Sequence, residues 1–156
     1  STFYESVNLL ALRQRNILYF LDVAQGFKTR ESFCFSPYVN SIDVFEHREN
    51  FYISGPDMKN GLGKIRILDH VSLVLIDKFD GMYALAHNDY LYFTNFNGML
   101  SIRNVANKYE KIKNISLCMF PQKPMISKNN LLFIISSKNL GTILTIVDIS
   151  DDHKVI

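Results

Sequence analysis

Residues 82–95 read MYALAHNDYLYFTN, two different apolar patterns on either side of a polar turn. The first segment alternates up to residues 87–89 (HND), and a nearly continuous apolar run, YLYFT, follows. Alternation and short apolar runs bounded by turn-forming residues are both typical of β-strands. The stretch therefore predicts a β-hairpin.

The same hairpin pattern occurs four times along the chain. The copies read NLLALRQRNILYFLD (residues 8–22), SIDVFEHRENFYISG (41–55), MYALAHNDYLYFTN (82–95) and PMISKNNLLFIISS (124–137). When Tyr19, Tyr52, Tyr92 and Phe133 are matched, successive copies lie 33, 40 and 41 residues apart. Recurrence near forty residues in β-rich sequence is typical of propeller blades, each a small sheet that cannot bury its faces alone. The sequence thus predicts an all-β chain of about four antiparallel propeller-type blades, as part of a larger β-propeller.

The repeat also predicts where each blade begins and ends. The approximate blades are residues 6–37, 38–79, 80–120 and 121–156 of one propeller segment that spans the chain. The first blade is expected to hold only three strands or a short outer edge, because its copy lies closer to the next one than the others do. Residues 1–5 are expected to be available for pairing with a neighbouring blade.

Further strands follow each hairpin. In the third copy these are residues 99–105 and 109–115, and in the fourth they are 142–149 and a short strand at 153–156. In the second copy, residues 55–63 hold three glycines and a proline and are expected to form a loop. Strands at 64–69 and 71–76 should follow that loop. Packing between blades is expected to involve Leu10, Leu12, Phe20, Val44, Ile53, Leu85, Phe93, Ile126, Phe133 and Ile146.

Two alternatives to this architecture stay open. Residues 10–23 contain enough Leu and Arg for a local helix, although the matching segments in the other copies carry turn residues that helices tolerate badly. A β-sandwich with coincidental spacing is the main all-β competitor.

Composition and charge limit the class of protein. The chain has 12 Phe and 8 Tyr, and 47% of its residues are hydrophobic, which is globular and favours strands. A net charge of +2 is too mild to predict a nucleic-acid surface. No apolar run is long enough to span a membrane as a helix, and we expect an intracellular, soluble protein. Cys34 and Cys118 both lie in apolar runs and are expected to be buried free thiols rather than a disulfide.

One segment resembles a known repeat family. Residues 142–155 (TILTIVDISDDHKV) are similar to the phrase that names the LVIVD-repeat propellers, a strand that ends in Val-Asp before a Ser-Asp turn. Residues 17–23 (ILYFLDV) and 64–70 (KIRILDH) are similar in outline, whereas the third copy has Asn104 at the Asp position. The Trp-Asp signature of WD-type propellers is missing. The resemblance implies a propeller of the diverged, WD40-like kind, and such propellers mostly act as protein-interaction platforms.

Basic side chains recur in the turn of each hairpin. Equivalent turns of a propeller emerge on one face, so these residues are expected to form a basic arc that could hold an acidic peptide, a phosphate or a nucleic-acid backbone. The residues are Arg13, Arg15, His47, Arg48, His87 and Lys128. Polar residues of either sign also collect in exposed turns, and this plainer interpretation remains open.

The opposite face should carry the long loop, whose charged members Asp57 and Lys59 are candidate binding residues because ligands often sit at the loops of a propeller mouth. A simple solvated connection is the alternative for this loop. His47 and His87 occupy matching turns, but no third ligand is placed to complete a metal site, so we expect no metal and no other cofactor. Motifs for a nucleophile, a phosphate-binding loop or a dinucleotide fold are missing from the sequence. We therefore expect no enzyme but a non-catalytic scaffold that binds a protein partner or further blades of its own parent protein. The alternative is a nucleic-acid-associated subunit that uses the basic turns, and a propeller-type enzyme comes third.

Overall fold

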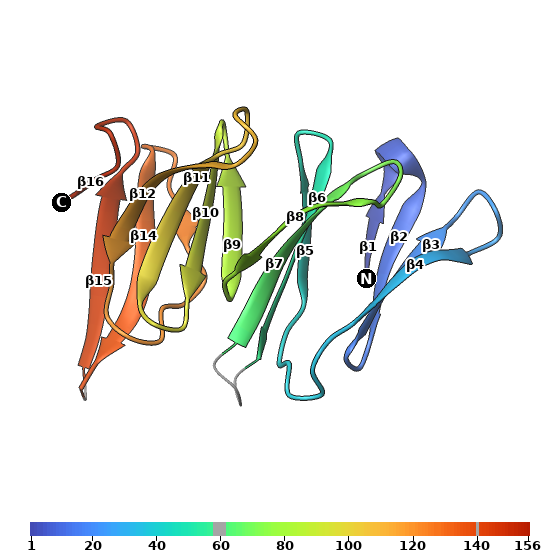
Figure 1. Ribbon diagram of the computed structural model, residues 1–156, viewed down its shortest axis with the longest axis horizontal. Helices are drawn as coiled ribbons and strands as arrows, with labels where there is room; N and C mark the ends of the chain where they lie inside the picture. The colour runs from blue at the N-terminus through green and yellow to red at the C-terminus, as the bar shows by residue number, and fades with distance from the viewer. Residues whose placement is uncertain (58–61, 140) are drawn as a thin grey trace. The chain divides into compact units, whose positions relative to one another are not determined.

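The structure is a computed structural model that describes residues 1–57, 62–139 and 141–156 (Figure 1). The chain divides into two compact units, Ser1–Phe79 and Asp80–Ile156, and each is described by itself. Strands dominate both units, and the described residues contain one short 3₁₀ helix, η1 (Glu5–Val7). The helix considered for residues 10–23 does not form, because these residues lie mostly in two strands. None of the helices in the described part of the protein has the length and apolar character to cross a membrane.

The first unit contains two antiparallel four-stranded sheets, each with its strands in sequence order. The first sheet consists of β1 (Thr2–Tyr4), β2 (Leu9–Gln14), β3 (Ile17–Asp22) and β4 (Lys28–Cys34). The second sheet consists of β5 (Asp43–His47), β6 (Asn50–Asp57), β7 (Leu62–Asp69) and β8 (Leu75–Asp80). Sheets of four antiparallel strands in sequence order are the unit of a propeller blade.

The first strand was not expected. β1 pairs with β2 of its own sheet, with Tyr4 opposite Leu9, so residues 1–5 are not left over for a neighbouring blade and the first sheet has four strands rather than three. Tyr4 also reaches the second sheet, where its hydroxyl donates to the Val44 carbonyl at 3.0 Å. Its ring meets Phe51 edge-on at 4.7 Å. The N-terminal segment therefore joins the two sheets of the first unit.

Because of this extra strand, the hairpin recognised in the first copy does not occupy the same strand positions in its sheet as the hairpins of the other copies. The hairpin matched to the first and second strands of the other copies is β2–β3, the second and third strands of its sheet. The pairing of β3 with β4 shifts register after its fourth residue, Phe20, and that of β11 (Met99–Asn104) with β12 (Glu110–Ser116) shifts after Ile102, also the fourth. β3 and β11 also share one burial pattern. Tyr19 is therefore not the counterpart of Tyr52, which explains the short first spacing.

The core of the first unit forms between its two sheets. Leu9, Leu18 and Phe20 of the first sheet cluster with Phe51 and Ile53 of the second, and all five are 0–2% exposed. Burial of aliphatic and aromatic side chains of this size stabilises a domain by roughly 1.5–3 kcal/mol each. The prediction that Leu12 packs between blades is wrong, since its side chain is 37% exposed. In β2 the core-facing positions are Leu9 and Ala11, which follows from the shifted phase.

The second unit repeats the same arrangement. Its first sheet has β9 (Tyr83–His87), β10 (Tyr90–Asn95), β11 and β12, in the order β9-β10-β11-β12. Its second sheet has β13 (Met125–Ile126), β14 (Leu131–Lys138), β15 (Gly141–Asp148) and β16 (Lys154–Val155). The four strands predicted for the third copy are confirmed. A core of Tyr92, Leu100, Ile102, Leu132, Ile134 and Val147 joins the two sheets.

The third strand of every sheet ends in an Asp or Asn that caps the following turn. Asp22 accepts a hydrogen bond from the Gln25 amide, and Asn104 accepts one from the Ala106 amide. Asp69 accepts from the Ser72 amide at 2.7 Å, and Asp148 from the Ser150 amide at 2.9 Å. Short polar side chains that bond to the backbone two or three residues ahead stabilise turns. The Asp of the LVIVD-like phrase therefore serves as a turn former here.

Two predicted boundaries in the second sheet were wrong. Residues 71–74 belong to the turn capped by Asp69, where Leu73 has φ of 60°, and the outer strand is instead β8. Part of the expected loop at 55–63 is strand, because β6 continues to Asp57 and β7 begins at Leu62, with Gly55 paired to Lys64.

Candidate functional site

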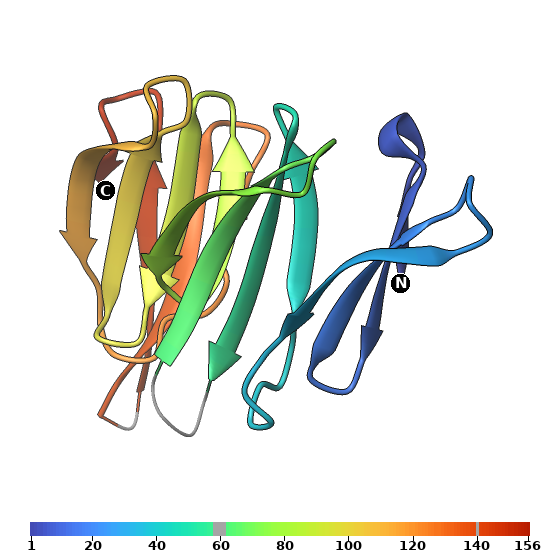
Figure 2. The ribbon, with the colours of Figure 1, turned by 45° about the vertical axis from the view of Figure 1, so that its right-hand side comes forward.

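The basic turns of the first unit lie at opposite ends of their sheets. In Figures 1 and 2 the β2–β3 turn, which carries Arg15, and the β5–β6 turn, which carries Arg48, point in opposite directions within that unit. The shifted phase is the cause, because η1 takes the position at the first sheet that the β5–β6 turn takes at the second. The hydroxyl of Ser6, within η1, lies 3.4 Å from a carboxylate oxygen of Glu46. The first unit therefore does not form the single basic arc that the sequence predicted.

Arg13 has a structural partner. Its guanidinium donates to the carbonyls of Arg15, Asn40 and Val39 at 2.7, 3.1 and 3.2 Å. These bonds tie the β2–β3 turn to the segment that connects the first sheet with the second. Arg15 and Arg48 are exposed, and His47 is half-buried beside the Tyr52 ring at 6.5 Å.

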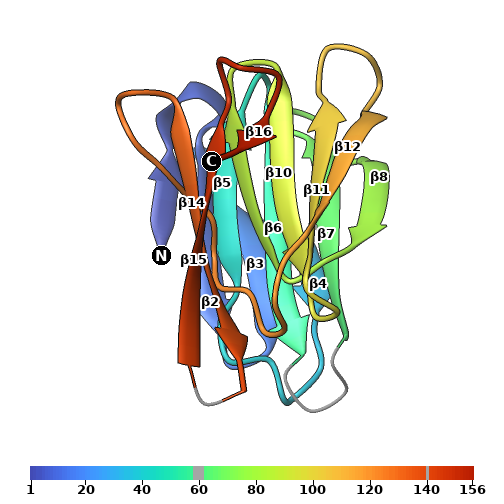
Figure 3. The ribbon, with the colours of Figure 1, turned by 90° about the vertical axis from the view of Figure 1, so that its left-hand side faces the viewer.

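In the second unit the two predicted basic turns share one end. Figure 3 shows the β9–β10 turn and the β13–β14 turn at the same end of their sheets. The first follows His87, whose buried Nε2 has no hydrogen-bond partner within the described part of the protein, and the second carries the exposed Lys128. His47 and His87 belong to different units. Among the described residues, no three His, Cys, Asp or Glu side chains gather as a metal site would require.

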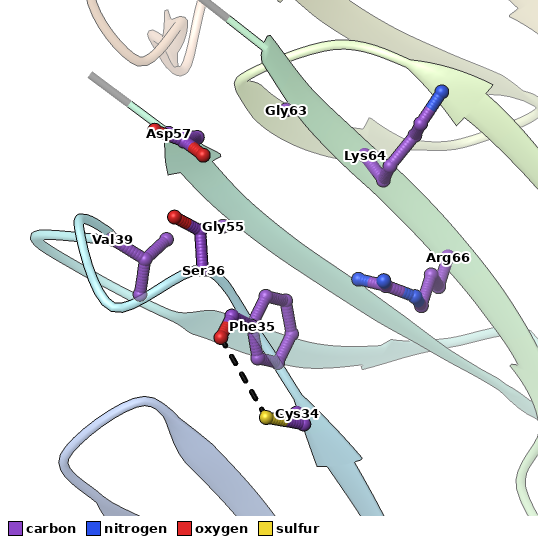
Figure 4. A pocket seen from close by; sticks show the side chains of 9 residues that line it. All are labelled: Cys34, Phe35, Ser36, Val39, Gly55, Asp57, Gly63, Lys64 and Arg66. Carbon is purple, nitrogen blue, oxygen red and sulfur yellow. Dashed lines mark hydrogen bonds between the residues drawn. The ribbon is translucent and has the colours of Figure 1, made fainter. Parts of the chain in front are cut away.

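One recess of the first unit lies at the end of the sheets near β6 and β7. It is a cavity of about 140 Å³ between the β4–β5 connection and these two strands (Figure 4). Its lining residues are Cys34, Phe35, Ser36, Val39, Gly55, Asp57, Gly63, Lys64 and Arg66. We call this recess the Arg66 pocket. Of the predicted loop residues, Asp57 lines the pocket, and Lys59 lies outside the described residues.

Arg66 and Phe35 form the centre of the pocket. The Arg66 guanidinium carbon lies 4.8 Å from the centroid of the Phe35 ring, a cation–π contact. The ring is buried and lies against Gly55, where an added Cβ would come within 2.7 Å of the ring carbon Cδ1. Gly55 therefore leaves the space that the ring occupies, and the ring in turn supports the guanidinium.

The electrostatics of the pocket centre on a half-buried cation. Burial lowers the pKa of the Arg66 guanidinium, which nevertheless stays protonated at neutral pH. No hydrogen bond or ion pair to Arg66 occurs among the described residues, so its N–H groups are available to a ligand. Asp57 at the rim is 9% exposed. In Figure 4 the Lys64 side chain extends away from the Phe35 ring, whereas Arg66 reaches towards it.

The cysteines differ from the sequence prediction in one respect. Both thiols are free, as expected, but Cys34 is exposed and Cys118 is half-buried. Cys34 lies at the edge of the Arg66 pocket, where its Sγ is 3.7 Å from the Phe35 carbonyl oxygen. A thiol at this place gives chemical access to the pocket.

Sequence reasoning missed Arg66, Lys64 and Phe35. Arg66 stands between Ile65 and Ile67, both fully buried, so it belongs to the alternate positions of a strand with one apolar face. That alternation was the one available signal for a cation on the opposite face. Nothing in the sequence indicated that Phe35, thirty-one residues earlier, lies beneath it.

No protein-family model and no curated protein matches this sequence. Among solved structures, hydrazine synthase of Kuenenia stuttgartiensis matches with a TM-score of 0.65 at 13% identity, covering 96% of this chain and 46% of that one. BamB from Moraxella catarrhalis matches with a TM-score of 0.55 at 12% identity, covering 96% and 57%. Saccharomyces cerevisiae Sqt1 matches with a TM-score of 0.58 at 15% identity, covering 88% and 40%.

These similar structures are β-propeller-like proteins, and likeness at such low identity shows the fold alone. The chain spans about half the length of the structures it matches. Its four antiparallel four-stranded sheets are blades of the propeller type.

Proposed function

We propose that residues 1–156 belong to a larger β-propeller that acts as a non-catalytic scaffold for a protein partner. The Arg66 pocket is the observation that supports this most directly, with its volume of about 140 Å³ and its mixture of aromatic, cationic and anionic side chains. Pockets for drug-sized ligands occupy roughly 300–1,000 Å³. A smaller recess suits one side chain of a partner better than it suits a cofactor or a nucleotide.

Two general arguments support the larger ring and the scaffold role. Four blades are near the minimum for a closed propeller, and blades bury their faces only against neighbours. The LVIVD-like phrase implies a class of propellers used mainly as interaction platforms. The exposed turn residue Arg15, whose β2–β3 turn is bonded through Arg13 to the pocket residue Val39, is proposed as a peripheral contact of the same partner. Arg48 and Lys128 are proposed as contacts of their own units, and no catalytic step is assigned to the protein.

Site-specific crosslinking tests the scaffold. A photo-reactive amino acid replaces Tyr38, which is 47% exposed beside the pocket, and Leu144 on β15, which is 53% exposed, serves as the matched control site. We expect the Tyr38 position to crosslink one protein that also rebinds the purified chain. Arg66→Met should weaken that rebinding, and Lys28→Gln on β4 should not. Crosslinked material that nuclease removes, with binding that falls steeply as salt rises, would replace the scaffold by the nucleic-acid alternative.

A further inference from the structure

We propose that the Arg66 pocket binds a carboxylate of a protein partner, carried by an Asp or Glu side chain or by the partner's C-terminal residue. This inference deepens the scaffold function and rests on it for the source of the carboxylate. It concerns the site itself, so it can be tested with small carboxylates in the absence of any partner.

The guanidinium is held in place before a ligand arrives. Arg66 lies on β7 opposite Ile53 of β6, so hydrogen bonds between these strands fix its backbone. The Phe35 ring contacts the guanidinium at 4.8 Å, and the ring itself packs closely against Gly55, where no side chain occupies its place. A side chain that is already ordered loses less conformational entropy on binding than a mobile one. The arrangement therefore favours binding through the planar fork of N–H groups.

Within the part of the chain that the structure describes, the same guanidinium has no ion-pair partner. It is half-buried, burial lowers its pKa, and no ion pair to it occurs among the described residues. A partly desolvated cation without a counter-charge is unfavourable, and an oxyanion bound by two parallel N–H···O bonds offsets that cost. The Phe35 ring covers one side of the guanidinium at 4.8 Å, so the ligand must approach from another side. This geometry suits a planar, bidentate carboxylate.

The charges around the pocket favour a single negative charge over a doubly charged group. Among the described lining residues, Arg66 and Lys64 are basic and Asp57 is acidic, so their formal charges sum to +1. The phosphate of a phosphoserine bears roughly −1.5 to −2 charges at neutral pH and would exceed that sum. A carboxylate matches the balance. The apolar side chains of Phe35 and Val39 can contact the methylene groups that carry it.

The first test is an NMR titration of residues 1–156, followed at the Arg66 Nε–H resonance. The carboxylate probes are N-acetyl-glutamate amide, for a side-chain carboxylate, and N-acetyl-glycine, for a C-terminal one. N-acetyl-glutamine amide is the neutral control of equal shape, and inorganic phosphate is the competing anion. We expect at least one carboxylate to shift Arg66 saturably while the glutamine analogue does not. Equal shifts from the glutamine analogue, or tighter binding of phosphate, would overturn the proposal. The better carboxylate probe identifies the source.

Variants then test whether the planar N–H donors of the Arg66 guanidinium bind the carboxylate. Arg66→Lys keeps a positive charge and an aliphatic stem but removes the bidentate donor set, and we expect carboxylate binding to weaken about tenfold. Arg66→Met should abolish it, and Lys28→Gln, an exposed change on β4, should leave it unchanged. Binding to these variants is followed at the Phe35 amide. If Arg66→Met unfolds, Arg66→Lys decides alone, and undiminished affinity in that variant refutes the bidentate site.

A covalent block gives an independent readout. Iodoacetamide should modify the exposed Cys34 at the edge of the pocket and thereby reduce carboxylate binding. In Cys34→Ser the same treatment should have no effect. Failure of these titrations removes the carboxylate ligand but leaves the scaffold, because crosslinking from position 38 tests that function separately.

Discussion

The hydroxyl of Tyr92 lies 3.0 Å from Nε2 of His153, although 61 residues separate them in the sequence. Tyr92 belongs to β10, and His153 to the turn between β15 and β16, so the bond joins the two sheets of the second unit. The imidazole is 2% exposed and meets the Tyr90 ring edge-on at 4.6 Å. Its burial lowers the pKa of His153, Lys113 lowers it further, and Asp152 acts in the opposite direction. The folded state therefore favours the neutral form of His153.

This environment predicts acid sensitivity above the range of the carboxylates. The pKa of His153 is lower in the folded state than its unfolded value of about 6.5, so the unfolded state binds the proton more readily. The stability contributed by neutral His153 is complete above pH about 6.5 and is lost as the pH falls towards the lowered folded value. Urea denaturation between pH 8 and pH 5 should show this slope. His153→Gln should flatten it.

The same pair predicts a cost for removing the tyrosine hydroxyl. In Tyr92→Phe, Nε2 of His153 loses its partner, and Nδ1 is already buried without one among the described residues. We expect a loss of about 1–3 kcal/mol in the free energy of unfolding, because a buried polar atom is left unsatisfied. Tyr19→Phe on β3 is the matched control. Equal effects of the two changes would contradict the importance of the bond.

The turn cap at Asp69 predicts a second, more acidic transition. Hydrogen bonds from the amide and hydroxyl of Ser72 lower the pKa of the Asp69 carboxyl, so the cap stabilises the fold above pH about 4 and is lost as the pH falls further. Asp69→Ala should cost about 1 kcal/mol at pH 7. Asp69→Asn should retain most of the stability, since Asn104 fills the equivalent position with a neutral acceptor. Thermal unfolding at pH 7 and pH 3 distinguishes the variants.

Gly55→Ala should destabilise the first unit. The added methyl would meet ring carbons of Phe35 at 2.7 and 2.8 Å, both inside van der Waals contact. Overpacking of this kind costs about 1–3 kcal/mol. Gly26→Ala provides a comparison, because no atom lies within 4 Å of its added Cβ and only its φ of 69° is unfavourable. A double variant with Phe35→Leu should recover part of the loss seen for Gly55→Ala, and no recovery would show that the ring is not the cause.

The β5–β6 turn predicts a stabilising change. Arg48 and Glu49 have φ values of 48° and 62°, which bulky L-residues adopt at a cost. Two successive residues with positive φ are typical of a type I′ turn, for which Asn-Gly is the favoured sequence. We expect the double change Arg48→Asn and Glu49→Gly to raise the free energy of unfolding by about 1 kcal/mol. Urea denaturation measures it, and unchanged stability would contradict the inferred strain.

The sequence predicted the strands well where alternation and turn residues agreed. In the third copy both signals point to the same boundaries, and four strands form there. In the first copy two sequence matches competed. The segment ILYFLD could correspond to NFYISG of the second copy, because both follow a hairpin turn, or to KIRILD, because both end in Asp. The structure supports the second match, since Asp22 and Asp69 both cap the turn after a third strand. A blade contains several hairpins, so a hairpin alone does not show which strands form it. The Asp or Asn cap occurs once per blade, after the third strand, and therefore identifies the position of each strand in its blade.

The candidate site was much less predictable. A turn residue such as Arg13 can be recognised as polar, but whether its guanidinium binds a ligand or the carbonyls of Val39 and Asn40 depends on a contact distant in sequence. The Arg66 pocket depends on Phe35, which lies in a connection with no periodic pattern. Local patterns report which face of a strand is apolar, and they do not report which ring a cation will contact.

The position of β1 has a practical consequence for engineering this protein. A module that is to be duplicated, deleted or transplanted must be cut where one blade ends and the next begins. Cuts placed by hairpin similarity, before residue 8, would separate Tyr4 from the Val44 carbonyl that it binds and leave β2 without its edge partner. The connection between Cys34 and Asp43 is the natural splice site in phase with the sheets, although a splice there removes Phe35 from beneath Arg66.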